Sequence, residues 1–224
     1  RSAEKMLMKP QMAWEEIQDL CLQAVARFPE GSELYIKPMF FCADGFLLPD
    51  ADKTQFVLHV FKVPMPGDQG FSACFSSFAR SWPNMAPTDA KASCLYPNGQ
   101  RAIREAAEKG FDNAIMLDGA GNLAEFATSN LWLAKDGVVS TPVDNGTFLN
   151  GITRRRVLAL LKADGIEVQE RSLTRADVEA ADEVFSSGNY GKVVHVNRVE
   201  DRALEYGPIA RRAHQLYMEY AEST

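Results

Sequence analysis

The chain is organised around Phe148-Leu149-Asn150-Gly151-Ile152-Thr153-Arg154, which predicts a turn running into a helix that begins near Ile152. The first turn of a helix leaves backbone N–H groups without partners, and the helix dipole adds a partial positive charge there. Gly151 has no Cβ to block an approaching anion, Thr153 adds a hydroxyl donor, and residues 154–156 are three arginines. This stretch therefore indicates anion binding, although short glycine motifs also begin ordinary surface helices.

The composition is typical of a soluble globular protein. With 224 residues, of which 46% are hydrophobic, the chain is long enough to bury a substantial core. It contains no apolar run of membrane-spanning length, and residues 1–10 lack the apolar core of a signal peptide. We therefore expect a cytoplasmic location and no membrane contact.

Charge and cysteine content narrow the function classes further. The net charge is −6 at pH 7 and the isoelectric point is near 5.2, which argues against nucleic-acid binding because a phosphate backbone requires a basic face. The four cysteines include no C-x-x-C pair, and none lies at zinc-ligand spacing from a histidine. Reduced thiols and no metal site are expected.

The first part of the chain predicts a small domain. An amphipathic packing helix is expected at residues 14–28, and strands are expected at 34–42 and 55–63. Residues 64–70 read Pro-Met-Pro-Gly-Asp-Gln-Gly, and two prolines with two glycines in seven residues suit an interdomain loop. The chain is thus divided into a small α/β domain at 1–63 and a larger domain at 71–224.

The larger domain mixes strands with helices. Strands are expected at 71–78, 113–117, 130–134, 138–141, 166–170, 183–186 and 193–199, and helices at 98–109, 152–163 and 208–220. Asp136-Gly137 is typical of a β-hairpin turn, and Thr174 with Asp177 is an N-cap signature for a further short helix. The interleaved elements predict an α/β or α+β sheet protein.

Three polar residues near the ends of predicted elements are candidates for chemistry. Lys91 follows a proline-rich loop between two alanines, and a partly desolvated lysine can attack carbonyl groups. Glu125 lies in an apolar setting just before a predicted strand and needs a partner, for which a protonated ring nitrogen would serve. Tyr96 would bring a phenol to the same place. Taken singly, a solvated lysine, a surface glutamate and a packed tyrosine are the commoner outcomes.

Four motifs follow one another along the chain. They are Ala90-Lys91 with Tyr96, Glu125-Phe126-Ala127-Thr128-Ser129-Asn130-Leu131-Trp132, Leu149-Asn150-Gly151-Ile152-Thr153-Arg154, and Ser187-Gly188-Asn189. In order and approximate spacing they resemble the class IV pyridoxal-phosphate aminotransferases of fold type IV, and among these the branched-chain amino acid aminotransferases. The resemblance covers nearly the whole chain, and the motifs E-x-x-x-S-N-L and L-x-G-I-T-R are specific when they occur together.

The resemblance implies a role for each matching residue. Lys91 would bond to pyridoxal 5′-phosphate and move the proton of the substrate Cα, while Glu125 would face the pyridine nitrogen. Tyr96 would hydrogen-bond the phenolic oxygen, and Leu149 would pack under the ring. The phosphate would be bound by the N–H groups of Ile152 and Thr153, and Gly151, Gly188 and Asn189 complete the implied cofactor site.

Some parts depart from the family pattern. The small domain would be truncated in this chain, because the family has an opening segment with a phosphate-binding arginine, for which Arg1 should not be mistaken. Tyr35-Ile36-Lys37-Pro38 resembles a substrate-binding strand that usually reads Y-I-R-P, and a lysine there replaces a planar fork by a point charge. Asn189-Tyr190-Gly191 stands where Thr-Ala-Ala is common, and the bulky Tyr190 would reshape the substrate pocket.

Several activities fit these residues. The leading expectation is a homodimeric aminotransferase that moves an amino group from a branched-chain-like amino acid to 2-oxoglutarate by a ping-pong mechanism. A D-amino-acid or amine transaminase, or a lyase similar to aminodeoxychorismate lyase, would use the same Lys91 and Glu125. A non-enzymatic remnant of the fold is the remaining alternative, and it is disfavoured because random drift would not preserve all four motifs.

Overall fold

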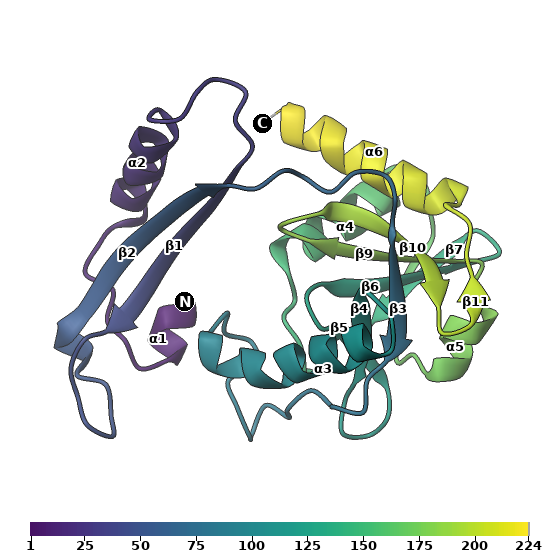
Figure 1. Cartoon of the computed structure of the whole chain (residues 1–224), viewed down its shortest axis with the longest axis horizontal. Coiled ribbons are helices and arrows are strands. Elements are labelled where there is room, and N and C mark those ends of the chain that lie inside the picture. The colour runs from purple at the N-terminus through teal and green to yellow at the C-terminus, as the bar shows by residue number, and fades with distance from the viewer. Residues whose placement is uncertain (224) are drawn as a thin grey trace. The chain divides into compact units, whose positions relative to one another are not determined.

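The computed structural model describes residues 1–223, and the chain forms two compact units, Arg1–Met65 and Pro66–Thr224 (Figure 1). The division lies inside segment 64–70, for which the sequence predicts an interdomain loop. The exact domain limits stay predictions. Across the described residues, none of the helices combines the length and the apolar character needed to cross a membrane.

The N-terminal unit is built on a β-hairpin. Strands β1 (Leu34–Cys42) and β2 (Thr54–Lys62) pair antiparallel, from Leu34 opposite Lys62 to Cys42 opposite Thr54. The hairpin is accompanied by α1 (Ser2–Lys5), α2 (Trp14–Val25) and the 3-10 turn η1 (Ala51–Lys53). Both strands were expected from their β-branched and aromatic residues, and the hairpin confirms them within a residue.

The helix of this unit differs from the sequence expectation. It ends at Val25 instead of residue 28, and none of its residues is buried. Trp14 exposes 68% of its surface and Leu22 exposes 60%. The prediction of a packing helix is confirmed in part, because α2 contacts both strands of the hairpin and its apolar residues Ile17 and Leu20 are half-buried, while Trp14 is exposed.

The larger unit is a nine-stranded mixed sheet. The order is β5-β4-β3-β10-β9-β6-β7-β8, with β11 paired to β10. The strands are β3 (Phe71–Phe75), β4 (Asn113–Leu117), β5 (Leu123–Phe126), β6 (Asn130–Lys135), β7 (Val138–Pro142), β8 (Val168–Arg171), β9 (Glu183–Gly188), β10 (Lys192–Val199) and β11 (Arg202–Ala203). The sheet curls, because the edge strand β5 also contacts β6 and β7.

Helices cover the outside of the curled sheet (Figure 1). They are α3 (Tyr96–Glu108), which follows the 3-10 turn η2 (Ser93–Leu95), together with α4 (Ile152–Ala163) and α6 (Pro208–Glu222). The short helix α5 (Arg175–Ala180) instead packs Val178 into the core inside the curl. Pro97 suits the first turn of α3, which explains why this helix begins two residues before its predicted start. The Thr174 and Asp177 capping box of α5 and the Asp136-Gly137 hairpin turn are confirmed.

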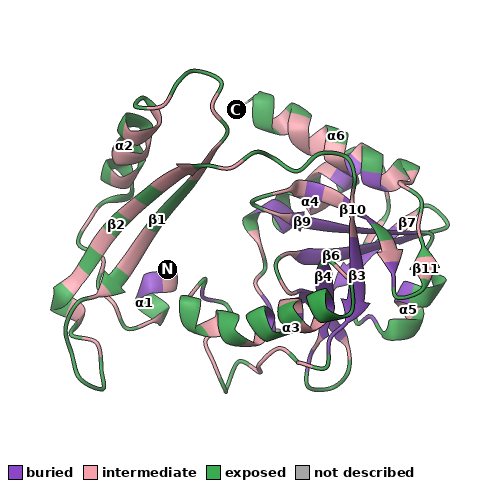
Figure 2. Ribbon diagram, viewed as in Figure 1, coloured by how far each residue is buried: buried purple, intermediate pink, exposed green. Residues whose placement is uncertain are grey.

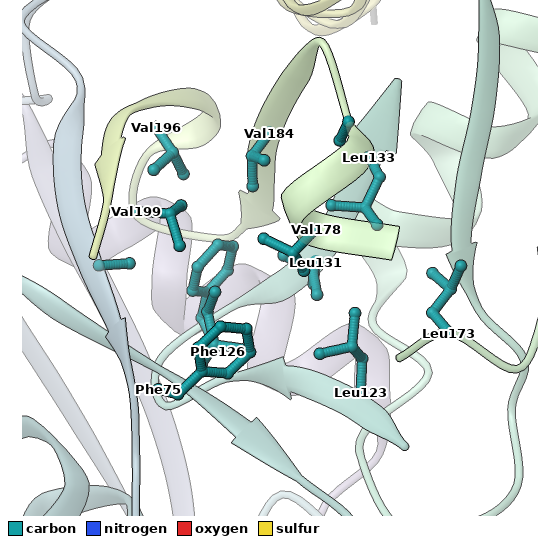
Figure 3. Packing of buried hydrophobic residues seen from close by; sticks show 13 residues of the cluster. Phe75, Leu123, Phe126, Leu131, Leu133, Leu173, Val178, Val184, Val196 and Val199 are labelled. Atoms are coloured by element: carbon teal, nitrogen blue, oxygen red, sulfur yellow. The ribbon is translucent and has the colours of Figure 1, made fainter. Parts of the chain in front are cut away.

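Alternation along the strands creates separate apolar cores. On β4, Ile115 faces the interior of the curl, while Ala114 and Met116 face α3. On β6, Leu131 and Leu133 face the interior, whereas Trp132 packs with α4 and α6. Buried residues accordingly concentrate on the strands, and the outer faces of α3 and α6 remain exposed (Figure 2). The interior core is shown in Figure 3.

Strand β5 carries an extra residue. Its register places Phe126 opposite Ile115, Glu125 opposite Met116 and Leu123 opposite Leu117, so the pairing passes over Ala124. This bulge lets Leu123 and Phe126 both join the interior core (Figure 3). Glu125 therefore points to the opposite face, the one that Met116 presents toward α3. The strand expected just after Glu125 is confirmed as β6, but the sequence did not predict that Glu125 itself lies in a strand.

Candidate active site

Glu125 forms the centre of a buried polar cluster. It is 8% exposed, and its Oε1 lies 3.1 Å from Nη2 of Arg80. Arg80 comes from the irregular segment between β3 and η2, and its Nε donates to the carbonyl oxygen of Thr147 at 3.3 Å. A carboxylate with so little access to water requires such a partner.

The environment of Glu125 changes its acidity. Burial raises the pKa of Glu125 to about 7, while the charges of Arg80 and Lys91 act in the lowering direction. The effect of Lys91 also shows that its ammonium group lies within electrostatic range of the carboxylate. A carboxyl group with this pKa can hold or release a proton near neutral pH, as acid–base chemistry requires.

Asn130 connects the carboxylate to the turn before α4. Its Nδ2 donates to Glu125 Oε2 at 3.2 Å and to the carbonyl oxygen of Leu149 at 2.8 Å. A Cβ added at Gly151 would lie 2.5 Å from Asn130 Oδ1. The close contact with Asn130 therefore requires a glycine at this position. The sequence alone explained Gly151 only by the approach of an anion.

The N-terminus of α4 has the properties of an anion site. Gly151 is the N-cap residue and supplies no side-chain cap for the first turn. Ile152 exposes 80% of its surface, and the neighbouring Thr153 is 9% exposed. The helix dipole adds partial positive charge at this end, where Asn130 already brings the turn close to Glu125.

The three arginines that follow do not act as one cationic cluster. Arg154 is 1% exposed, and its Nη2 donates to the carbonyl oxygen of Pro142 at 2.8 Å and to Glu170 at 3.0 Å. The guanidinium of Arg156 lies 4.0 Å from the ring centroid of Tyr220. The expectation of three cations beside the anion is therefore corrected, since Arg154 holds α4 against β7 and β8 instead.

Tyr96 begins α3, and Lys91 lies just before the 3-10 turn η2 that leads into this helix. Lys91 is exposed and follows Ala90, which is completely buried. Tyr96 is the first residue of α3 and exposes 41% of its surface. The helix is held near β5, because a Cβ added at Gly99 would lie 3.3 Å from the carbonyl oxygen of Ala127.

The turn between β9 and β10 lies next to the start of β6. A Cβ added at Gly188 would lie 3.2 Å from Cβ of Ser129. The carbonyl oxygen of Asn189 accepts a hydrogen bond from Lys192 Nζ at 2.6 Å, and Tyr190 exposes 47% of its surface. Gly188 is thus close to the residue that precedes Asn130, the side chain that binds Glu125.

This arrangement agrees with the result of comparison to known families. Residues 1–199 match the family described as Amino-transferase class IV. The chain belongs to this family. It is a pyridoxal-phosphate-dependent aminotransferase, and its mixed curled sheet agrees with the fold type IV expectation.

Similar proteins include branched-chain aminotransferases. The branched-chain-amino-acid aminotransferase of Salmonella typhimurium is 34% identical over 216 residues, which are 91% of this chain and 69% of the relative. A structure of a Brucella abortus aminotransferase bound to pyridoxal phosphate has a TM-score of 0.96 and 42% identity, and the match covers 99% of this chain and 80% of that one. The structure of a Thermoproteus uzoniensis branched-chain aminotransferase with norvaline has a TM-score of 0.88 and 29% identity, and the match covers 98% of this chain and 75% of that one.

The residues of this aminotransferase fit its cofactor. The buried carboxyl group of Glu125, whose pKa is about 7, could pair with the protonated ring nitrogen of pyridoxal phosphate. The first turn of α4 has no side-chain cap, so its N–H groups could bind the phosphate. Asn130 holds these two places together, and the charge of Lys91 reaches the same carboxylate.

Two predicted substrate residues of the aminotransferase lie in the other unit. Tyr35 stacks on Phe61 with ring centroids 5.5 Å apart, and Lys37 lies opposite His59 in the hairpin. Their substrate roles stay predictions. Sequence reasoning assigned no role to Arg80 or Asn130, although Asn130 lies inside a quoted motif. A lone arginine in a segment expected to be irregular gives no local signal of an ion pair with Glu125.

Proposed function

We propose that this aminotransferase transfers the amino group of a branched-chain-like amino acid to 2-oxoglutarate by a ping-pong mechanism. The names of relatives from Salmonella typhimurium and Aquifex aeolicus support the donor class, and norvaline in the Thermoproteus uzoniensis structure is an amino acid with an unbranched aliphatic side chain. One observation carries the proposal. Lys91 acts electrostatically on a buried Glu125 that Asn130 links to the N-terminus of α4.

The proposed roles follow from the position of each residue. When bound, the cofactor supplies an electron sink for the carbanion that forms at the substrate Cα. Lys91 would be the residue that holds the cofactor, and its amine would take up and return the proton at the substrate Cα. Glu125 keeps the ring nitrogen protonated, and Tyr96 orients the phenolic oxygen. Leu149 would pack against the cofactor ring.

The remaining cofactor residues hold the phosphate. The N–H groups of Ile152 and Thr153 bind it at the first turn of α4, with Gly151 as the residue that allows the close turn. Gly188 and Asn189 border the same place from the turn after β9. For the substrate we propose Tyr35, Lys37 and Tyr190, of which Lys37 would meet the carboxylate as a point charge.

A homodimer is part of the proposal. The loop between β1 and β2 carries Phe46, Leu47 and Leu48, which expose 99%, 88% and 72% of their surfaces. Three adjacent exposed apolar side chains mark an interaction site, and a second copy of the chain is the partner we propose. Sedimentation velocity of the protein tests this. The cytoplasmic location stays a prediction from the sequence.

The decisive experiment combines a donor screen with one lysine variant. Purified protein is assayed with 2-oxoglutarate and both L- and D-amino acids, and we expect glutamate to form fastest with aliphatic L-donors. Lys91→Ala is expected to lose the visible absorbance of the bound cofactor and all turnover. Lys135→Ala, at an exposed position on β6, is the matched control and should retain both. Retained absorbance and turnover in Lys91→Ala would contradict the assignment.

A further inference from the structure

The segment that carries Lys91 is fastened to the loop that leads into α4. Thr88 is 2% exposed, and its hydroxyl donates a hydrogen bond to the carbonyl oxygen of Gly146. The chain around it is tightly folded, because Thr88 N donates to Ala86 O at 2.8 Å, Ala90 N to Pro87 O at 2.8 Å, and Ala92 N to Ala90 O at 3.1 Å. Fixing Thr88 therefore also fixes the backbone from which the Lys91 side chain extends.

Three carbonyl groups of the same loop are held by side chains of the site. Thr88 binds the carbonyl of Gly146, Arg80 binds that of Thr147 at 3.3 Å, and Asn130 binds that of Leu149 at 2.8 Å. Arg80 and Asn130 also bind the carboxylate of Glu125. The loop backbone at 146–149 thus connects the lysine segment, the carboxylate and the first turn of α4.

The loop is itself well fixed. Asn145 Oδ1 accepts hydrogen bonds from the backbone N of Thr147 at 3.1 Å and from its hydroxyl at 2.7 Å. Asn145 Nδ2 donates to Asp118 at 2.9 Å, which ties the loop to the turn before β5. At Gly146 φ is +80°, and an added Cβ would lie 2.7 Å from Pro83. These contacts allow the loop to serve as a rigid reference for the side chains that bind it.

We propose that Thr88 is a positioning residue, whose hydroxyl bond to Gly146 sets the place of the Lys91 amine relative to Glu125 and α4. This inference rests on the proposed function, because it takes Lys91 as the lysine that binds the cofactor. Of the three side chains that bind the loop, only Thr88 makes no bond to Glu125 among those described. Its contribution is therefore separable from that of the carboxylate.

The test compares two variants that differ in one hydroxyl group. Thr88→Ser and Thr88→Ala both lose the methyl group, and only the alanine variant also loses the bond to Gly146. Thr141 provides the matched control, because it is fully buried and its hydroxyl donates to the carbonyl oxygen of Leu131 at 2.8 Å. Thr141→Ser and Thr141→Ala thus remove the same groups where the hydroxyl binds β6 and not the loop at 146–149.

Two readouts report on the lysine. For Thr88→Ala we expect the pH midpoint of the visible absorbance of the holoenzyme to shift by about half a unit or more. Its kcat should fall by about 10- to 100-fold, because misplacement by about 1 Å has effects of this size. Thr88→Ser should retain both wild-type values. Both Thr141 variants should also retain them, even where Thr141→Ala lowers the melting temperature.

Equal behaviour of Thr88→Ala and Thr88→Ser overturns the inference, and so does an equal shift in Thr141→Ala. If Thr88→Ala does not fold, Thr88→Cys takes its place, because a thiol is a weak donor close in size to serine. The same shift relative to Thr88→Ser is then expected, and its absence overturns the inference. A wild-type holoenzyme without the visible absorbance contradicts the proposed function, whereas an absorbance indifferent to the Thr88 hydroxyl contradicts only the role of Thr88.

Discussion

Two arginine–glutamate pairs of the larger unit have almost the same geometry and different surroundings. The Arg80–Glu125 pair has an N–O distance of 3.1 Å, and its side chains expose 9% and 10% of their surfaces. The Arg154–Glu170 pair has a distance of 3.0 Å, with Arg154 exposing 1% and Glu170 exposing 36%. Both arginines also donate to a backbone carbonyl, Thr147 for the first and Pro142 for the second.

The difference lies in how far water reaches the carboxylate. At Glu125 both charges are removed from water, and burial raises the pKa of this acid to about 7 although a guanidinium lies beside it. At Glu170 the carboxylate keeps contact with solvent, and the pair anchors the first turn of α4 to β7 and β8. The two pairs therefore differ in the solvent exposure of the glutamate and hardly in the distance to the arginine. The buried Glu125 is suited to proton chemistry, whereas the Arg154–Glu170 pair supports the fold.

Replacing the two glutamates gives the largest expected contrast. Glu125→Gln should lower kcat by about 10²–10³-fold, because a neutral amide no longer stabilises a protonated ring nitrogen. Glu170→Gln should leave kcat close to the wild-type value, since Glu170 keeps contact with solvent and a glutamine oxygen can still accept the hydrogen bond from Arg154. Steady-state kinetics of both variants measure the contrast. Near-native turnover in Glu125→Gln would remove this residue from its proposed role.

The pH dependence of stability should be specific to the first pair. The pKa of Glu125 is about 7 in the folded protein and 4.5 in the unfolded chain, so between these values the folded state binds more protons. The free energy of unfolding of the cofactor-free protein should therefore fall as pH rises from 4.5 to 7, by up to about 3 kcal/mol.

Urea denaturation at several pH values measures this fall. Because other groups also titrate, the quantity of interest is the difference between wild type and Glu125→Gln. Glu170→Gln should follow the wild-type slope. If the free energy of unfolding changes with pH in the same way for wild type and Glu125→Gln, Glu125 does not take up a proton on folding.

Removing the second arginine should have a smaller effect on stability. Arg154→Met leaves the carbonyl of Pro142 without its donor, while the exposed Glu170 regains water. We expect a loss of about 1–3 kcal/mol in the free energy of unfolding, independent of pH between about 5 and 8. Arg155→Met, at an exposed neighbouring position, is the control and should change stability by about 0.5 kcal/mol or less. Equal losses in the two variants would contradict the anchoring role of Arg154.

Local pattern predicted most of the fold of the larger unit. Strands 113–117 and 130–134 each contain a continuous apolar run, at 114–117 and 131–134, and the hairpin turn and the α5 capping box are short-range signals, so each was visible in the sequence. Strand β5 was missed because it is four residues long, contains a charge and carries a bulge that breaks alternation. The unburied α2 shows that an amphipathic pattern predicts a helix more reliably than its burial.

The candidate site was only partly visible in the sequence. Lys91 and Glu125 were identified through motifs whose residues lie close together along the chain. Arg80 and Thr88 gave no such signal, because their partners Glu125 and Gly146 are distant in sequence and are reached only once the sheet has formed. Contacts between a side chain and a remote backbone carbonyl have no sequence pattern of their own.

The order of inward and outward side chains along β5 is part of the site. Because the register passes over Ala124, Leu123 and Phe126 share the interior while Glu125 is directed outward. Deletion of Ala124 would leave these faces unchanged, whereas deletion of Phe126 would bring Glu125 opposite Ile115 and place a charge in the apolar core. Loss of the codon for Phe126 would thus be more damaging than most substitutions, and a transplant of this site into another sheet must copy the order of inward and outward side chains and can omit the bulge.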